Sequence, residues 1–108
     1  ENRSFRLENI VFLELKRRGA EVFYGSSDSG REIDFLTRSD EGWEQYQVAD
    51  TLTDENRKRE LGAFALAAPH IKGCRTLLSL DTAEETVLYD GLEIKRQNLI
   101  KWLVNETL

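Results

Sequence analysis

The sequence predicts an α/β domain in which a central mixed β-sheet is flanked by α-helices. Helix-forming residues fill the segment 7–18, short strand patterns follow over residues 21–48, and a second helical segment separates them from later strands. A helix between two strands allows a crossover to a parallel neighbour. The sheet is therefore expected to be mixed, with helices packed on its faces.

The first helix is predicted over residues 7–18 and ends at Gly19, which readily adopts the left-handed cap conformation. Its apolar side chains cover most of a helical wheel, so we expect the helix to be largely buried. Glu8 and Glu14 fall inside apolar arcs of that wheel, whereas Lys16 and Arg17 lie in its polar sector.

A three-stranded meander is predicted next, with strands over residues 21–24, 31–37 and 43–48. The connections at residues 25–30 and 39–42 are rich in residues that tolerate unusual backbone angles. A second helix follows, and it ends at about residue 68 because Pro69 comes next. Thr53 or Asp54 is predicted to cap its start.

The remaining chain is predicted to add a strand, a hairpin and a helix. Residues 75–80 are almost continuously apolar, which is typical of a strand inside a sheet. The Asp-Gly pair at residues 90–91 predicts a hairpin between strands 86–89 and 92–95. A terminal helix over residues 97–104 closes the domain, in which Trp43 and Trp102 are expected to anchor packing.

Length and charge limit the classes of function. A chain of 108 residues, 40% hydrophobic and 32% charged, suits one globular domain. Its net charge of -5 opposes non-specific attraction to phosphates, so nucleic acid is not the favoured partner despite the basic cluster at residues 57–59. The chain contains no methionine and is interpreted as a fragment, residues 1–108, of a longer protein.

The expected location is the cytoplasm. Cys74 is the single cysteine of the sequence and cannot form an internal disulfide, which favours a reducing compartment. No apolar stretch approaches the ~20 residues that span a bilayer, so no membrane partner is expected.

Acidic side chains on separate elements suggest metal chemistry. Alternation places Glu32 and Asp34 on one face of their strand, with Ile33 and Phe35 on the other, and Gln47 lies on the next strand. Hard divalent ions bind converging carboxylates, and Glu8 or Glu14 with Asp34 supplies two of them. A third carboxylate and a cation that positions water are absent from the pattern.

Several segments, in this order, carry a resemblance to a known family: residues 7–15, 31–35, 46–48, 59–61 and 102–103. The chain resembles the uncharacterised C-terminal domain of a family of prokaryotic AAA-type ATPases. That domain is similar in fold to PD-(D/E)XK nucleases, so the resemblance implies a restriction-endonuclease-like sheet. It also implies a parent ATPase whose nucleotide site lies upstream of this fragment.

The resemblance implies a degenerate active site. In active nucleases of this kind, a helix acid, a strand aspartate and the glutamate of a Glu-x-Lys motif bind metal, and the lysine aids the nucleophile. By position these are Glu8, Asp34, Gln47 and Ala49, of which the first two fit and the last two do not. The expected function is therefore a non-catalytic module that needs no cofactor. Its expected partners are the upstream ATPase domain, further copies in a homo-oligomer, or nucleic acid.

Alternatives remain at each position. A Mg²⁺- or Mn²⁺-dependent nuclease would use Glu8 and Asp34 with a migrated Lys58, or less readily Arg57. In a structural cluster, Asp34 would instead accept backbone N–H groups from the neighbouring loop, and the Gln47 amide would donate to a buried carboxylate. In that case Glu14 would pair with a base such as Arg31. A pure interaction domain would show an exposed apolar patch.

Overall fold

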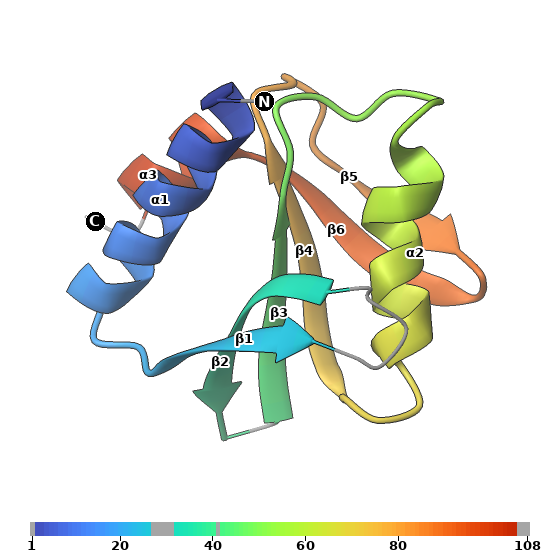
Figure 1. The fold of residues 1–108 in the computed structure, drawn as a ribbon, viewed down its shortest axis with the longest axis horizontal. Helices are drawn as coiled ribbons and strands as arrows, with labels where there is room; N and C mark the ends of the chain where they lie inside the picture. The colour runs from blue at the N-terminus through green and yellow to red at the C-terminus, as the bar shows by residue number, and fades with distance from the viewer. Residues whose placement is uncertain (1, 27–31, 41, 106–108) are drawn as a thin grey trace.

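The computed structural model describes residues 2–26, 32–40 and 42–105 of the chain. The predicted order of helices and strands is confirmed (Figure 1). No helix within those residues is long and apolar enough to cross a membrane. The elements are α1 (Asn2–Arg17), β1 (Val22–Ser26), β2 (Glu32–Ser39), β3 (Gly42–Val48), α2 (Arg57–Ala67), β4 (Gly73–Ser79), β5 (Glu85–Tyr89), β6 (Leu92–Asn98) and α3 (Leu99–Asn105).

The strands in the described part of the chain form a six-stranded sheet in the order β1-β2-β3-β4-β6-β5. The β1–β2–β3 meander and the β5–β6 hairpin are antiparallel, whereas β3–β4 and β4–β6 are parallel. Helix α2 makes the crossover between β3 and β4, as predicted. Figure 1 shows α1 and α3 on one side of the sheet and α2 on the other. The predicted α/β class with a mixed sheet is therefore confirmed.

Each face of the sheet is packed against its helices by an apolar cluster. Trp102 is buried beside α1, and Trp43 packs at the edge of the cluster under α2, so both tryptophans anchor packing as predicted. The cluster under α1 and α3 contains Leu7, Val11, Leu15, Phe35, Val48, Leu78, Leu99 and Trp102, and the cluster under α2 contains Ile33, Leu36, Ala49, Leu61, Ala63, Phe64, Leu77 and Ile94.

The prediction that the first helix is largely buried is wrong in part. Helix α1 rests on the sheet through one side, which carries Leu7, Val11 and Leu15. The side chain of Ile10 lies on the flank of the helix and that of Leu13 on its far side, and they remain 41% and 57% exposed. When apolar residues cover most of a helical wheel, the sequence does not indicate which of them will pack against the sheet.

The simple alternation predicted for β2 is also wrong, because this strand contains a β-bulge. Gly25 pairs with Ile33 and Phe23 pairs with Leu36, so two steps along β1 face three steps along β2. Ile33 and Leu36 consequently both pack under α2, whereas Phe35 packs under α1. The side chain of Asp34 therefore extends from the bulged part of β2, where side chains do not alternate regularly between the two faces of the sheet.

Helix α2 starts later than predicted. It begins at Arg57 after Asn56, and neither Thr53 nor Asp54 caps it. The Thr53 N–H donates to Asn56 Oδ1 at 2.8 Å, and the Asn56 N–H donates to Thr53 Oγ1 at 3.1 Å. Thr53 and Asn56 thus close a turn before the helix, because their side chains bond each other's backbone instead of the first helical turn.

The hairpin predicted at Asp90 and Gly91 is confirmed, and both residues have the positive φ angles, 51° and 78°, that a tight hairpin turn requires. Strand β6 extends beyond its predicted end to Asn98. Helix α3 then starts at Leu99 instead of residue 97, because the Lys101 N–H donates to Asn98 Oδ1 at 3.0 Å.

Asp81 holds the loop after β3 against β6. Its carboxylate accepts hydrogen bonds from Thr51 Oγ1 at 2.6 Å, from the Leu52 N–H at 2.9 Å and from Arg96 at 2.8 Å. Burial alone would raise the pKa of Asp81, but the hydrogen bonds from Leu52, Thr51 and Arg96 outweigh it and lower the pKa from 3.8 to about 2.

Asp81→Asn is expected to lower the free energy of unfolding at neutral pH by about 1 kcal/mol. Because the folded-state pKa of Asp81 is lowered, its stabilisation is present above pH 3.8 and is lost as the pH falls toward about 2. Urea unfolding of both chains between neutral pH and pH 2 measures this difference. An equal loss from Asp54→Asn, which changes an exposed carboxylate, would contradict the assignment.

Candidate functional site

Asp34 and Gln47 meet where β2 and β3 separate. Backbone pairing of these strands ends at Phe35 opposite Tyr46. One step further, the Asp34 N–H donates to Gln47 Oε1 at 2.7 Å, and the Val48 N–H donates to Asp34 Oδ2 at 2.9 Å. The two side chains thus continue the hydrogen-bonding ladder after the backbones have diverged.

The other end of the Gln47 amide binds α2. Gln47 is 4% exposed, and its Nε2 donates to the backbone oxygen of Glu60 at 3.2 Å and to Glu60 Oε1 at 3.4 Å. Both the oxygen and the nitrogen of this amide are therefore engaged inside the protein. We name Asp34, Gln47 and Glu60 together the strand-helix cluster.

The sequence patterns did not identify Glu60 as a site residue. Its carboxylate lies at the inner side of α2, where burial raises its pKa and the Arg59 guanidinium partly opposes that rise. A signal was present, because Glu60 lies one helical turn before the buried Phe64 and so shares its side of the helix. The structure therefore places a third acid beside Gln47, on an element different from those predicted.

Glu8 lies on α1, a helix on the other side of the sheet from Glu60 (Figure 1). It lies one helical turn before Phe12, whose ring centroid is 6.1 Å from that of Phe35. Glu8 is half-buried, as its place in an apolar arc predicted. The structure therefore places Glu8 on the helix whose Phe12 packs against Phe35, the residue after Asp34.

Ala49 occupies the position where the resemblance implies a lysine. It is 3% exposed and belongs to the apolar cluster under α2. Its N–H donates to the Leu78 backbone oxygen at 3.0 Å, so the chain here is held against β4. A lysine ammonium at this position would be buried among apolar side chains, which is unfavourable without a partner.

The two basic residues that could replace the missing lysine of the motif, Lys58 and Arg57, lie on different sides of α2. Lys58 is exposed and lies two residues, about 200° around the helix, from Glu60. Arg57 is half-buried and lies three residues before Glu60, on the same side of α2. The orientation of α2 therefore favours Arg57 over Lys58 as a cation near the strand-helix cluster.

Glu14 pairs within its own helix. Its carboxylate accepts hydrogen bonds from Arg17 at 2.9 and 2.6 Å and from Arg18 at 2.8 Å. The hydrogen bond from Arg17 is the main reason that the pKa of Glu14 falls to about 2. The pairing was expected, but the partner differs from Arg31, which lies outside the described residues. Arg18 also stacks 4.1 Å from the Trp102 ring.

These features define an α/β domain with a buried polar cluster at a strand divergence. Among the described residues, no three His, Cys, Asp or Glu side chains group as ligands for a metal ion. No protein-family model matches the chain.

Two similar proteins extend well beyond this domain. An uncharacterised protein of Haemophilus influenzae is 34% identical over 104 residues, which are 95% of this chain and 24% of that protein. An uncharacterised protein of Methanocaldococcus jannaschii is 38% identical over 76 residues, which are 67% of this chain and 17% of that protein. The chain thus spans about a quarter or less of the length of these relatives.

Proposed function

We propose that this domain is a nuclease-like module that does not cleave and that provides contacts within a longer cytoplasmic AAA-type ATPase. The observation that carries the proposal is the state of Gln47. Its amide oxygen accepts from Asp34 and its amide nitrogen donates to Glu60, so the side chain is fully used in joining β2, β3 and α2. At this position of the catalytic motif, the side chain therefore forms its hydrogen bonds within the protein.

The chemistry at neighbouring positions supports the same proposal. A neutral amide at Gln47 removes one negative charge from any metal shell, and Ala49 removes the ammonium that would position an attacking water. Because Ala49 packs under α2, the space for a lysine has been taken by the core. The sheet supports the proposed restriction-endonuclease-like resemblance by its class and element order.

A contact role also fits the chain's charge and context. The net charge of -5 disfavours a non-specific grip on nucleic acid. Both relatives are several times longer than the matched part, which is consistent with a module joined to other domains. A free, exposed Cys74 is consistent with a reducing cytoplasm.

A second candidate is a Mg²⁺- or Mn²⁺-dependent nuclease, which Glu60 favours. Its carboxylate lies within 3.4 Å of the Gln47 amide and could replace the acid missing from the motif. In that case Glu8, Asp34 and Glu60 would have to move together to hold the ion, because they do not form a ligand group in the described residues, and Arg57 or Lys58 would supply the cation.

Calorimetric titration of Mn²⁺ distinguishes the two proposals. The wild-type chain is expected to give no saturable heat, because the polar atoms of Gln47 and one oxygen of Asp34 are engaged by the protein. Asp34→Asn serves as the matched control, since it removes the charge and keeps the shape. Saturable binding that disappears in Asp34→Asn would contradict the structural proposal and support the nuclease.

A further inference from the structure

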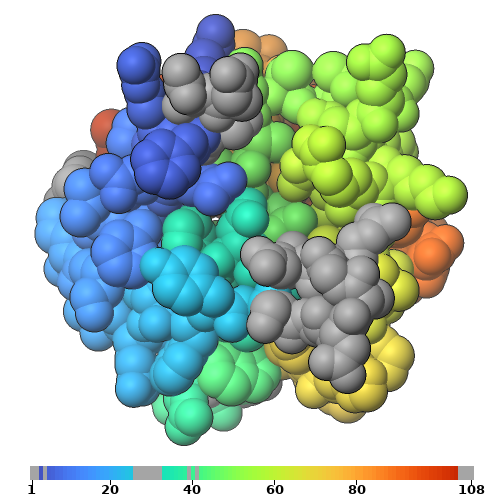
Figure 2. Space-filling view, viewed as in Figure 1, coloured from blue at the N-terminus to red at the C-terminus, as the bar shows by residue number. Residues whose placement is uncertain are grey.

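The outer side of α1 is apolar and basic. Phe5, Ile10 and Leu13 are 73%, 41% and 57% exposed there. Figure 2 shows the side chains of this helix, in dark blue, forming much of one flank of the molecule. Exposed apolar side chains that lie along one helix are typical of a contact surface.

The charges on this side of α1 are all of one sign. The exposed charged side chains described on α1 are Arg3, Arg6, Lys16 and Arg17, whereas Glu14 is turned inward with an 11% exposed side chain. Within the described residues, neither Arg6 nor Lys16 forms an ion pair. We name Phe5, Arg6, Ile10, Leu13 and Lys16 the basic helix surface, which is unusual on a chain whose net charge is -5.

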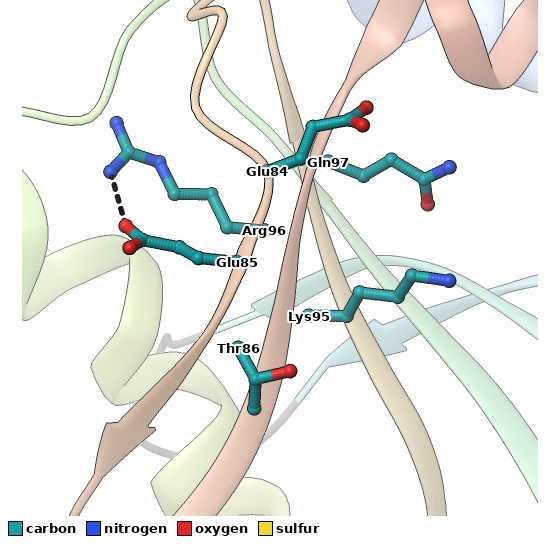
Figure 3. Close-up of a pocket in the computed structure, with 6 residues that line it drawn as sticks. All are labelled: Glu84, Glu85, Thr86, Lys95, Arg96 and Gln97. Atoms are coloured by element: carbon teal, nitrogen blue, oxygen red, sulfur yellow. Dashed lines mark hydrogen bonds and ion pairs between the residues drawn. The ribbon is translucent and has the colours of Figure 1, made fainter.

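A second exposed surface lies on β5 and β6. Figure 3 shows Lys95 and Gln97 pointing to one side of β6 and Arg96 to the other, where it pairs with Glu85. On the Lys95 side, hollows of about 340, 330 and 310 Å³ border that lysine. This part of the sheet is therefore open, although sheets of mixed α/β domains are normally covered on both faces.

The hairpin surface carries the charge that the helix surface lacks. Leu88 is 69% exposed and lies opposite Glu93 in the β5–β6 ladder. Asp90 and Glu93 are also exposed, against the single exposed base Lys95 of β6, whereas the charge of Glu84 is paired with Lys101 at 3.9 Å. We name Leu88, Asp90 and Glu93 the acidic hairpin surface.

We infer that copies of this chain associate head-to-tail, with the basic helix surface of one copy seated on the acidic hairpin surface of the next. The helix surface offers three exposed apolar side chains and the hairpin surface offers Leu88, and the charges around them are opposite in sign. Pairing of two identical α1 helices would instead oppose Arg6 and Lys16 to each other. A head-to-tail contact closes into a ring or extends as an open chain.

This inference rests on the contact role proposed above and names its partner as a second copy. It needs neither metal binding nor cleavage by the strand-helix cluster. A monomeric chain would overturn the inference and leave the Mn²⁺ titration unchanged, whereas Mn²⁺ binding would overturn the non-catalytic proposal and leave the assembly unchanged.

Sedimentation of paired variants tests the contact. Leu13→Asp adds an acid to the helix surface and Leu88→Lys adds a base to the hairpin surface, so each is expected to weaken self-association by at least ~10-fold. Mixing the two variants leaves one intact surface on each chain, so dimers are expected to reappear in the mixture. Leu66→Asp, at a 50% exposed position of α2, is the control that should assemble like wild type.

Three outcomes would overturn the inference. The wild-type chain could stay monomeric over the whole concentration range, or Leu66→Asp could disrupt assembly as strongly as the other variants. Alternatively, Leu13→Asp could abolish assembly while Leu88→Lys has no effect and the mixture is not rescued, which is the behaviour of symmetric pairing. Circular dichroism of each variant confirms that these exposed substitutions leave the domain folded.

Discussion

Gly73→Ala is expected to lower the free energy of unfolding by at least ~3 kcal/mol, because the two parallel strands at the centre of the sheet would have to separate. A Cβ on Gly73 would lie 1.6 Å from the Trp43 backbone oxygen. The φ angle of Gly73 is also +144°, a conformation that other residues rarely adopt. Since both causes act on β3 and β4, the substitution affects the strand that carries Gln47.

Gly91→Ala is the matched control for this prediction. Gly91 also has a positive φ, +78°, but a Cβ there meets nothing within 4 Å. Its replacement should cost about 1 kcal/mol, from backbone strain alone. Urea unfolding of wild type, Gly73→Ala and Gly91→Ala measures both losses of stability. Equal losses from the two variants would show that the close contact with the Trp43 backbone oxygen adds nothing to the cost of Gly73→Ala.

Gln47→Leu is expected to lower the free energy of unfolding by about 2–4 kcal/mol. The substitution fills similar volume but removes the acceptor of the Asp34 N–H and the donor to Glu60. Both remaining groups would stay away from water without a partner, and such orphaned groups are costly. Chemical denaturation measures the loss. An unchanged dependence of the unfolding free energy on denaturant concentration would show that the fold itself is retained.

Gln45→Leu is a matched control on the same strand and the same face. Gln45 is fully buried, but its Nε2 makes only a long contact of 3.5 Å to the Ile71 oxygen. Its Oε1 has no hydrogen-bond partner within the described chain. Leucine should therefore cost less than ~1 kcal/mol here. A similar cost at both positions would mean that the Gln47 bonds contribute little beyond burial.

The order of the elements could be read from the sequence because each signal is local. The crossover at α2, the central position of β4 and the hairpin at Asp90 follow from periodicity and turn chemistry. The bulge in β2 could not be predicted in this way. It arises because Ile33 and Leu36 both pack under α2 while Phe35 packs under α1, and that choice depends on tertiary contacts.

The candidate site was also predictable only where its residues follow from local strand patterns. Strand positions predicted that Asp34 and Gln47 lie together. A backbone N–H group does donate to Asp34, but it belongs to Val48 at the end of β3 and not to the neighbouring loop. The buried carboxylate that receives the Gln47 amide is Glu60, not Glu8 or Asp34. The spacing of Glu60 from Phe64 indicates its inward direction, but its contact with Gln47 depends on how α2 packs against β3, which the sequence of the helix does not show.

Mn²⁺ titration of wild type beside Gln47→Glu decides whether the strand-helix cluster is structural or binds an ion. Gln47→Glu places a third carboxylate between Asp34 and Glu60 and is the positive control for a site that can hold an ion. The account predicts no saturable heat for wild type and saturable binding for Gln47→Glu. Saturable binding by wild type, lost in Asp34→Asn, would contradict it.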